Sequence, residues 1–275
     1  MTQRLRQLES RVGCLLLERS TRRLRLTEEG RLLLDRSRAL LDDLDDITGL
    51  LNLRRNVISG NLRIAAPLGF GRRFITPLLA HFREQHPSVQ VSLTLTDRPV
   101  AAEDGHWDLI IHIGELKDSS MVMVRLAANE RFLVASPAYL AARGEPAEPA
   151  DLLRHDCLAL RQNEEDVTLW RFVDQQRRTV PVRIAPVMSS NDGEVVRTWA
   201  LRGCGLVVRS EWDVADDLRS GRLVRVLPHL RLPSADVVVL LNKRGGRTAR
   251  ASTFLGLLQD SLKPVPWRQG DALPK

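Results

Sequence analysis

The sequence has little of the residues that support covalent cross-links, metal sites or membrane insertion. Only three cysteines occur among 275 residues, Cys14, Cys157 and Cys204, and no two of them form a CxxC motif. Neither a disulfide framework nor a zinc site is therefore predicted. No run approaches the ~20 apolar residues that a membrane helix needs, and charged side chains stand near the start where a signal peptide needs an apolar stretch. We therefore expect a cytoplasmic protein with no membrane partner.

Motifs that carry catalysis or hold cofactors are also scarce. The sequence contains no GxxxxGK[ST] and no HExxH, and Gly69-x-Gly71 lacks the remaining glycine of a dinucleotide loop. His155, Asp156 and Cys157 are consecutive, and consecutive residues of a strand point to opposite faces, so they cannot form a nucleophile-base pair among themselves. A hydrolase or transferase thus lacks a credible nucleophile and base. We predict no catalytic residues, no metal and no cofactor.

What is present is typical of a folded protein with more than one compact unit. Hydrophobic residues make up 43% and charged residues 27% of the chain, which excludes collagen-like and largely disordered proteins. A length of 275 residues exceeds one typical domain of roughly 100 to 200 residues. The formal net charge of +7 makes a polyanionic partner plausible.

Charge is distributed in blocks near the start of the chain. Residues 1–25 contain seven arginines against two glutamates, whereas residues 26–50 contain three arginines against seven acids. Because phosphates attract cations and repel carboxylates, only the first block is suited to face nucleic acid.

The acidic block has the pattern of a long helix with a narrow apolar seam. Thr27 followed by Glu28 and Glu29 suits a helix start. A narrow seam requires a partner helix, so we predict a homodimer or homotetramer paired through residues 28–58; the alternative is a helix packed on its own body. The seam residues, spaced 4-3-4-3-4, are Leu33, Ser37, Leu40, Leu44, Ile47 and Leu51.

From residue 59 onward the chain alternates between period-two and helical apolar patterns, which indicates an α/β fold. Strand patterns at 62–66 and 89–95 flank a helical pattern at 74–82, and the same style repeats on a smaller scale after residue 136. If the strand at 237–241 returns to the first sheet, two lobes are joined by crossovers near 135 and 233, with a cleft between them. The expected division is lobe I at 59–135 and 233–263, lobe II at 136–232, and a frayed tail at 264–275.

Several ordered stretches resemble LysR-type transcriptional regulators. The resemblance runs from Gln7–Gly13 and Arg22–Gly30 through Gly60–Ala65 and Ala135–Leu140 to Gly205-Leu206, so it covers the whole chain. It implies a winged helix-turn-helix in residues 1–27, a long dimerising helix, and a two-lobed domain like that of periplasmic solute-binding proteins.

One departure from the family pattern concerns the start of the chain. Family members place about 30 residues, containing a first helix, before the residues that resemble Thr2–Leu5. That first helix braces the recognition helix against DNA. We favour a start codon assigned too far downstream over a truncated regulator whose helix-turn-helix is partial and whose DNA binding is impaired.

The resemblance also assigns residues to double-stranded DNA. The start of the recognition helix carries hydroxyl, amide and guanidinium donors, the kinds that reach base edges and phosphates in a major groove. The wing carries further arginines that reach the backbone or a narrow minor groove. The alternative is a solvated basic surface. The predicted DNA contacts are Thr2, Gln3, Arg4, Arg6, Arg22, Arg23 and Arg25.

Fold geometry predicts where a small-molecule effector binds. In open α/β sheets, ligands lie beyond the carboxyl ends of strands, near helix N-termini whose free N–H groups favour anions. The alternative is that these residues only cap helices or permit turns. An anion is one candidate effector, although Asp97, Glu115 and Asp192 leave its charge open. The predicted effector residues are Pro67, Leu68, Gly69, Phe70, Thr96, Asp97, Gly114, Glu115, Ser190, Asn191, Asp192 and Arg209.

The leading hypothesis is a ligand-responsive regulator in which an effector changes the arrangement of protomers, and with it DNA bending or contact with RNA polymerase. Two other hypotheses are weighed against it. A solute-binding protein for transport shares the two-lobed fold but predicts an export signal and no basic helix. A truncated effector-binding module predicts ligand binding without operator binding.

Arg23→Ala tests the predicted phosphate contacts of the wing. We expect weaker DNA binding across unrelated sequences, because a phosphate contact carries no base preference, and a salt slope reduced by about one. The measurement is the dissociation constant at several salt concentrations. An unchanged slope removes Arg23 from the phosphate contacts.

Overall fold

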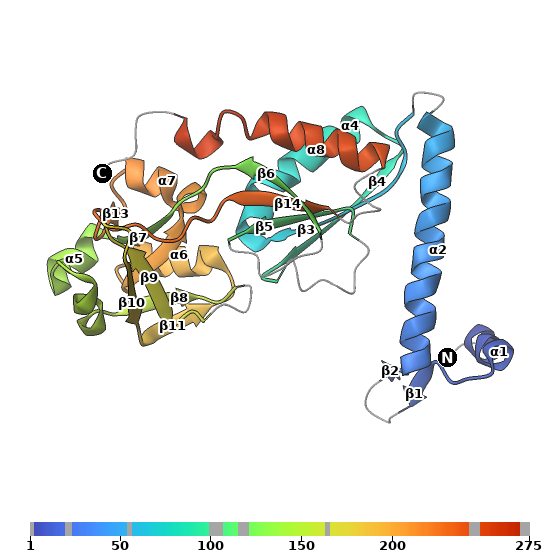
Figure 1. The fold of residues 1–275 in the computed structure, drawn as a ribbon, viewed down its shortest axis with the longest axis horizontal. Coiled ribbons are helices and arrows are strands. Elements are labelled where there is room, and N and C mark those ends of the chain that lie inside the picture. The colour runs from blue at the N-terminus through green and yellow to red at the C-terminus, as the bar shows by residue number, and fades with distance from the viewer. Residues whose placement is uncertain are drawn as a thin grey trace.

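The computed structural model describes residues 3–19, 24–53, 57–98, 107–114, 121–162, 166–241 and 248–269. A small N-terminal part leads into one long helix, which is followed by an α/β body of two lobes (Figure 1). No helix within these ranges is long and apolar enough to cross a membrane.

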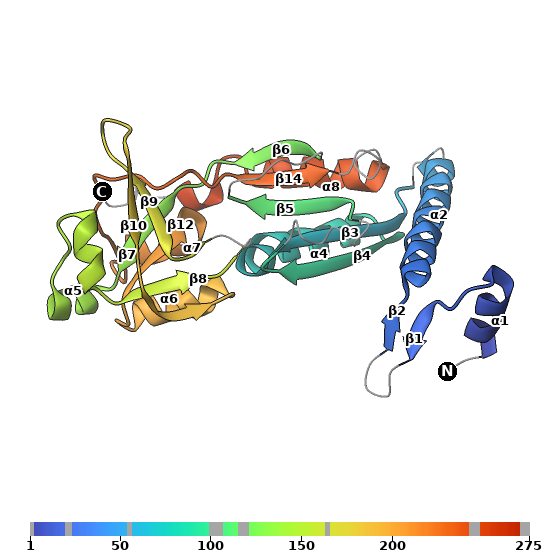
Figure 2. The same ribbon diagram turned by 60° about the horizontal axis from the view of Figure 1, so that its bottom comes forward.

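The N-terminal part is a helix and a two-stranded hairpin. The helix α1 buries none of its residues. In the hairpin, Leu17 pairs with Leu26 in antiparallel register. Figure 2 shows both elements at the end of the long helix that is remote from the body. Their bounds are α1 (Gln3–Val12), β1 (Leu17–Arg19) and β2 (Leu24–Leu26).

The long helix α2 (Glu28–Leu53) begins where the sequence predicts. The Gly30 N–H donates to Thr27 Oγ1 at 2.9 Å, which is the hydrogen bond of an N-cap. A Cβ on Gly30 would lie 2.0 Å from the backbone oxygen of Leu16. Only glycine therefore allows the helix to start this close to the preceding loop.

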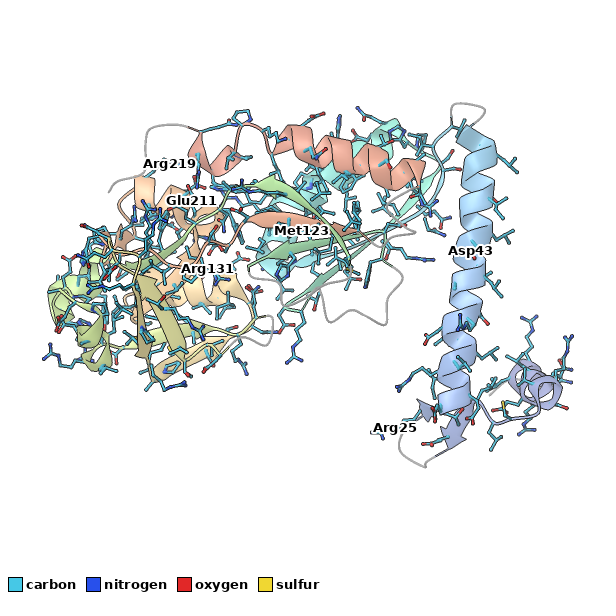
Figure 3. All side chains as sticks on the ribbon, in the orientation of Figure 1. Arg25, Asp43, Met123, Arg131, Glu211 and Arg219 are labelled. Atoms are coloured by element: carbon cyan, nitrogen blue, oxygen red, sulfur yellow. The ribbon has the colours of Figure 1, made fainter. Side chains whose placement is uncertain are left out.

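The predicted apolar seam of α2 faces away from the body. Leu40, Leu44, Ile47 and Leu51 are 70%, 60%, 56% and 59% exposed. Figure 3 shows the middle of α2, where Asp43 is labelled, standing clear of the two lobes. The alternative of a helix packed on its own body is therefore wrong for these residues.

The first lobe is a five-stranded sheet covered by helices. Strand β3 runs parallel to β4 and β5, whereas β14 runs antiparallel to β5 and β6. Helices α4 (Thr76–Gln85) and α8 (Ala249–Ser261) meet through the rings of Phe82 and Phe254, whose centroids lie 5.2 Å apart. Across the sheet the strands are β4 (Val89–Thr96), β3 (Gly60–Pro67), β5 (Leu109–Ile113), β14 (Val237–Leu241) and β6 (Val122–Ala127).

The second lobe has its own five-stranded sheet and a separate hairpin of β9 (Leu169–Val173) and β10 (Thr179–Arg183). Helices α5 (Pro137–Arg143), α6 (Gly193–Leu201) and α7 (Glu211–Arg219) belong to this lobe. Across the sheet the strands are β11 (Pro186–Ser190), β8 (Cys157–Leu160), β12 (Leu206–Ser210), β7 (Arg131–Ala135) and β13 (Val224–Arg225).

This lobe differs from the sequence expectations in two ways. The edge strand β11 was not expected, because none of its residues is fully buried and its apolar pattern is weak. The first crossover lies before Arg131 rather than near 135, because β7 pairs with β12 and β13 of the second sheet. An apolar strand has the same sequence pattern in either lobe, so only its pairing with other strands decides which lobe it joins.

The two crossovers are bonded to each other. Asn129, on the first, donates through Nδ2 to the backbone oxygen of Ala235, on the second, at 2.7 Å. The Ala235 N–H donates back to the backbone oxygen of Asn129 at 3.2 Å. Because Asn129 is buried, these bonds are shielded from water and fix the crossovers side by side.

The expected fraying of the tail is wrong for residues 264–269. A short 3-10 helix, Pro266–Arg268, places Trp267 in the core with 2% of its surface exposed. Arg268 Nη2 and Nε donate to the Glu211 carboxylate at 2.6 and 2.8 Å. The prolines suggested disorder, but one buried tryptophan and one ion pair anchor the segment to α7.

Trp267→Ala should destabilise the body by about 3–5 kcal/mol, because it leaves a cavity among aromatic rings. Urea denaturation followed by circular dichroism measures this change. The matched control is Leu153→Ala, since Leu153 is 67% exposed and its truncation should cost less than about 0.5 kcal/mol. Equal midpoints for the two variants would contradict an anchoring role for the tail.

Candidate functional site

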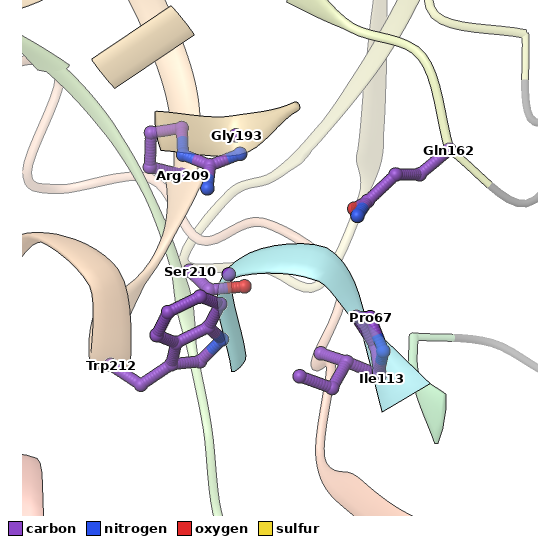
Figure 4. Close-up of a pocket in the computed structure, with 8 residues that line it drawn as sticks. Pro67, Ile113, Gln162, Gly193, Arg209, Ser210 and Trp212 are labelled. Carbon is purple, nitrogen blue, oxygen red and sulfur yellow. The ribbon is translucent and has the colours of Figure 1, made fainter. Parts of the chain in front are cut away.

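A small cavity lies between the lobes (Figure 4). Its volume is about 30 Å³, which is room for about two water molecules. The first lobe contributes Pro67, Gly69 and Ile113 to its wall. From the second lobe come Gln162, Gly193, Arg209, Ser210 and Trp212.

The cavity lies where strand topology places ligand sites. Pro67 and Ile113 are the last residues of β3 and β5, and Ser210 is the last residue of β12. Gln162 follows the end of β8, which runs parallel to β12. The carboxyl ends of strands in both sheets thus converge on one space, as expected for open α/β folds.

Arg209 is the one cation in the cavity wall, and it is 4% exposed. Its Nε and Nη2 both lie 2.8 Å from Asp213 Oδ2, so its charge has a partner one turn into α7. A Cβ on Gly193 would lie 2.1 Å from Arg209 Nη2. The guanidinium therefore rests directly on the start of α6, where only glycine leaves room for it.

Trp212 joins the cavity to the core of the first lobe. Its ring lies edge-on to Phe70, with centroids 5.4 Å apart, and to Phe74, at 6.1 Å. Its backbone N–H donates to Asn129 Oδ1 at 3.3 Å. One residue of α7 thus packs against the first lobe through its side chain and bonds to the crossover through its backbone.

Polar contacts cross between the lobes beside the cavity. Arg72 Nη2 lies 3.0 Å from Asp192 Oδ2 and 2.9 Å from Glu194 Oε2. The hydrogen bond from Arg72 to Asp192 raises the pKa of Arg72, against the opposing effect of burial. Asn191 Nδ2 donates to Asp97 Oδ2 at 3.1 Å. Because these groups are partly exposed, each ion pair contributes at most about 1 kcal/mol.

Several of the predicted effector residues divide between the cavity wall and the polar contacts beside it. Pro67, Gly69 and Arg209 line the cavity. Asp97, Asn191 and Asp192 form the polar contacts between the lobes.

The remaining predicted positions do not line this cavity. Phe70 is buried in the core of the first lobe. Asp192 also accepts a hydrogen bond from the Glu194 N–H at 2.9 Å and so caps α6. Glu115 lies outside the described residues. Absent from the cavity wall are Leu68, Phe70, Thr96, Asp97, Gly114, Ser190, Asn191 and Asp192.

Sequence reasoning missed five of the lining residues. The rule that ligands lie beyond strand ends leads to Gln162 when it is applied to β8, and to Ser210 when it is applied to β12. Trp212 had no such signal, because nothing in the sequence shows that α7 packs against the other lobe. The missed residues are Ile113, Gln162, Gly193, Ser210 and Trp212.

His155, Asp156 and Cys157, the consecutive titratable residues, lie in structural surroundings in the second lobe. Tyr139 Oη lies 3.2 Å from His155 Nδ1, and Arg143 Nη2 lies 2.6 Å from Asp156 Oδ2. Burial raises the pKa of the Cys157 thiol to about 12. Such a thiol stays protonated at neutral pH and is a poor nucleophile.

The predicted DNA-contacting residues that can be placed are exposed. Gln3, Arg4 and Arg6 lie on α1, and Arg25 lies on β2. Both elements lie at the end of α2 that is remote from the lobes (Figure 2). Thr2, Arg22 and Arg23 lie outside the described residues.

Two family models match the chain. Residues 1–31 match the model described as a bacterial regulatory helix-turn-helix protein of the lysR family. Residues 55–263, most of the chain, match the LysR substrate binding domain. The chain belongs to the LysR family of transcriptional regulators. Members of this family bind DNA and respond to an effector, and the solute-binding hypothesis is not supported, because relatives such as DmlR and TtdR are transcriptional regulators.

Two relatives and one solved structure are similar to this chain over most of its length. The regulator DmlR of Escherichia coli K12 is 32% identical over 85% of this chain and 76% of the relative. PtxR of Pseudomonas aeruginosa is 31% identical over 98% of this chain and 85% of the relative. The solved structure of CrgA from Neisseria meningitidis has a TM-score of 0.67 at 27% identity, over 94% of this chain and 87% of that one.

Gly193→Ala should displace the Arg209 guanidinium from the start of α6. We expect a loss of about 1–3 kcal/mol in stability, because the new methyl group overlaps a buried side chain. Gly256→Ala on α8 is the matched control, since nothing lies within 4 Å of its added Cβ, and it should gain up to about 1 kcal/mol. Thermal unfolding of both variants measures the difference. Stabilisation of both would contradict the close packing at Gly193.

Proposed function

We propose that this LysR-family regulator contacts double-stranded DNA through the exposed residues of α1 and the hairpin, pairs with a second copy through α2, and binds its effector in the cavity between the lobes. The observation that carries the proposal is α2. It connects a basic, exposed N-terminal part to the first lobe and leaves Leu40, Leu44, Ile47 and Leu51 of its apolar seam open to solvent.

The charges of the N-terminal part support DNA as the partner. Gln3, Arg4 and Arg6 stand together on α1, and Arg25 stands on the neighbouring hairpin. Amide and guanidinium groups read base edges and phosphates. Since α1 buries none of its residues, its polar face is available to a groove.

The seam supports a dimer. An exposed row of leucine and isoleucine side chains is costly in water and is typical of a helix that packs on another helix. A two-fold dimer would place two copies of α1 on one duplex, and two dimers would give a tetramer.

The cavity supports an effector that works through small rearrangements. Its wall combines residues of both lobes, so a bound molecule contacts both. A ligand shifts the regulator between states only by binding one state more tightly than the other. Arg209, the cation of the wall, favours an anionic effector. We further propose that the regulator acts in the cytoplasm, and that the effector alters DNA bending or contact with RNA polymerase.

DNA binding is tested by selecting duplexes from a random-sequence pool with the purified chain and measuring gel shifts of the selected sequences. We expect retention that falls steeply with salt, as phosphate contacts require. No selected duplex, alongside intact folding of the two lobes, would contradict operator binding and leave an effector module.

Leu44→Lys tests the dimer, because it places a charge in the middle of the apolar seam. We expect the mass from light scattering to fall toward that of one chain, and DNA affinity to fall at least roughly ten-fold, since both depend on pairing. Asp35→Lys introduces the same side chain at an exposed site on the opposite side of α2 and should leave the mass unchanged. A Leu44→Lys protein that keeps the wild-type mass would contradict the paired helices.

A further inference from the structure

The indole N–H of Trp212 has no hydrogen-bond partner among the described residues. The side chain is 6% exposed and lines the cavity. Figure 4 shows its nitrogen on the edge of the ring turned toward Pro67 and Ile113, across the cavity. A buried donor without an acceptor costs free energy, so such groups are rare in folded proteins and often mark a ligand position.

Other donors face the same space. Ser210 precedes α7, yet its side chain makes no capping hydrogen bond to that helix. Arg209 uses Nε and Nη2 for Asp213, which leaves Nη1 without a hydrogen bond to the residues that the structure describes.

The wall of the cavity contains no carboxylate that could pair with Arg209. None of the eight lining residues is acidic, and Gln162 supplies the only side-chain amide. Asp213 lies behind the guanidinium and is bonded to it. The wall therefore offers a cation and neutral donors to whatever enters, and it lacks a carboxylate to compete for them.

The size of the space limits the group that fits. A cavity of about 30 Å³ holds about two water-sized groups. The two oxygens of a carboxylate match that volume, whereas the remainder of a larger molecule must extend toward the cavity mouth.

We propose that this cavity reads a carboxylate, one oxygen accepting the hydrogen bond of Trp212 Nε1–H and the other facing Arg209. Trp212 is then a specificity-determining residue of the effector site. This inference rests on the proposed function, because it assigns a ligand class to the site where the effector is placed.

The test uses acetate as the probe, with acetamide as its neutral counterpart and chloride as a simple anion at equal ionic strength. Nitrogen-15-labelled protein gives one indole N–H resonance for each tryptophan, and the resonance missing in Trp212→Phe identifies Trp212. We expect acetate to move this resonance with an affinity on the order of millimolar. Acetamide should bind at least roughly ten-fold more weakly, because it lacks the charge that Arg209 reads.

Trp212→Phe removes the donor and keeps an aromatic ring. Because this variant lacks the Trp212 indole resonance, acetate titrations of the variant and of the wild type are compared through the backbone amide resonances of Gly193 and Ser210, which line the cavity. We expect the acetate affinity of the variant to fall roughly 10- to 100-fold, the range for a hydrogen bond to a charged group. Trp267→Phe is the matched control, since the Trp267 indole nitrogen is also buried without a partner but does not line the cavity. It should bind acetate like the wild type, and both variants should stay folded, because neither leaves a polar group unpaired.

Several results would overturn the inference. These are a Trp212 resonance that saturating acetate does not move, an equal response to chloride or acetamide, or equal acetate affinities in Trp212→Phe and the wild type. If these occur while the wild-type chain still binds selected duplexes, the ligand class is wrong and the proposed function stands. If instead no duplex is selected while acetate still binds, operator binding is wrong and the carboxylate site stands.

Discussion

Four aromatic side chains join the two lobes. Phe70 and Phe74 of the first lobe meet Trp212 of the second lobe and Trp267 of the C-terminal segment, with ring centroids 4.8 to 6.2 Å apart. Each such ring buries about 150–250 Å², worth about 4–6 kcal/mol at ~25 cal/mol per Å². The exposed ion pairs beside the cavity contribute at most about 1 kcal/mol each. The cluster, rather than the ion pairs, therefore holds the lobes together.

This packing limits how the regulator can respond to an effector. Wide opening of the lobes would expose the aromatic cluster and break the paired crossovers at Asn129 and Ala235. Small movements of α6 and α7 cost far less, and both helices begin at the cavity wall. A molecule bound in the cavity would therefore contact the starts of both helices.

The long helix separates two tasks that need different surfaces. Its first turn touches the basic N-terminal part, where Gly30 lies against Leu16. Its last turns reach the first lobe, where Asn52 Nδ2 donates to Ser59 Oγ at 2.8 Å. Between these contacts the apolar seam is exposed. The 26 residues of α2 therefore hold these two parts at opposite ends of one helix.

Local patterns were enough to predict α2, its cap at Thr27, the alternation of strands and helices, and several positions at strand ends. These features depend on residues close together in the chain, because periodicity and capping act over one or two turns. The lobe that β7 joins, the anchoring of Trp267 and the place of Trp212 in the cavity depend on partners more than 40 residues away. No local rule encodes such partners, because a buried tryptophan has the same sequence signature whichever surface it packs against. Folding of the whole chain alone decided that Trp212 presents an unpaired donor to the space between the lobes.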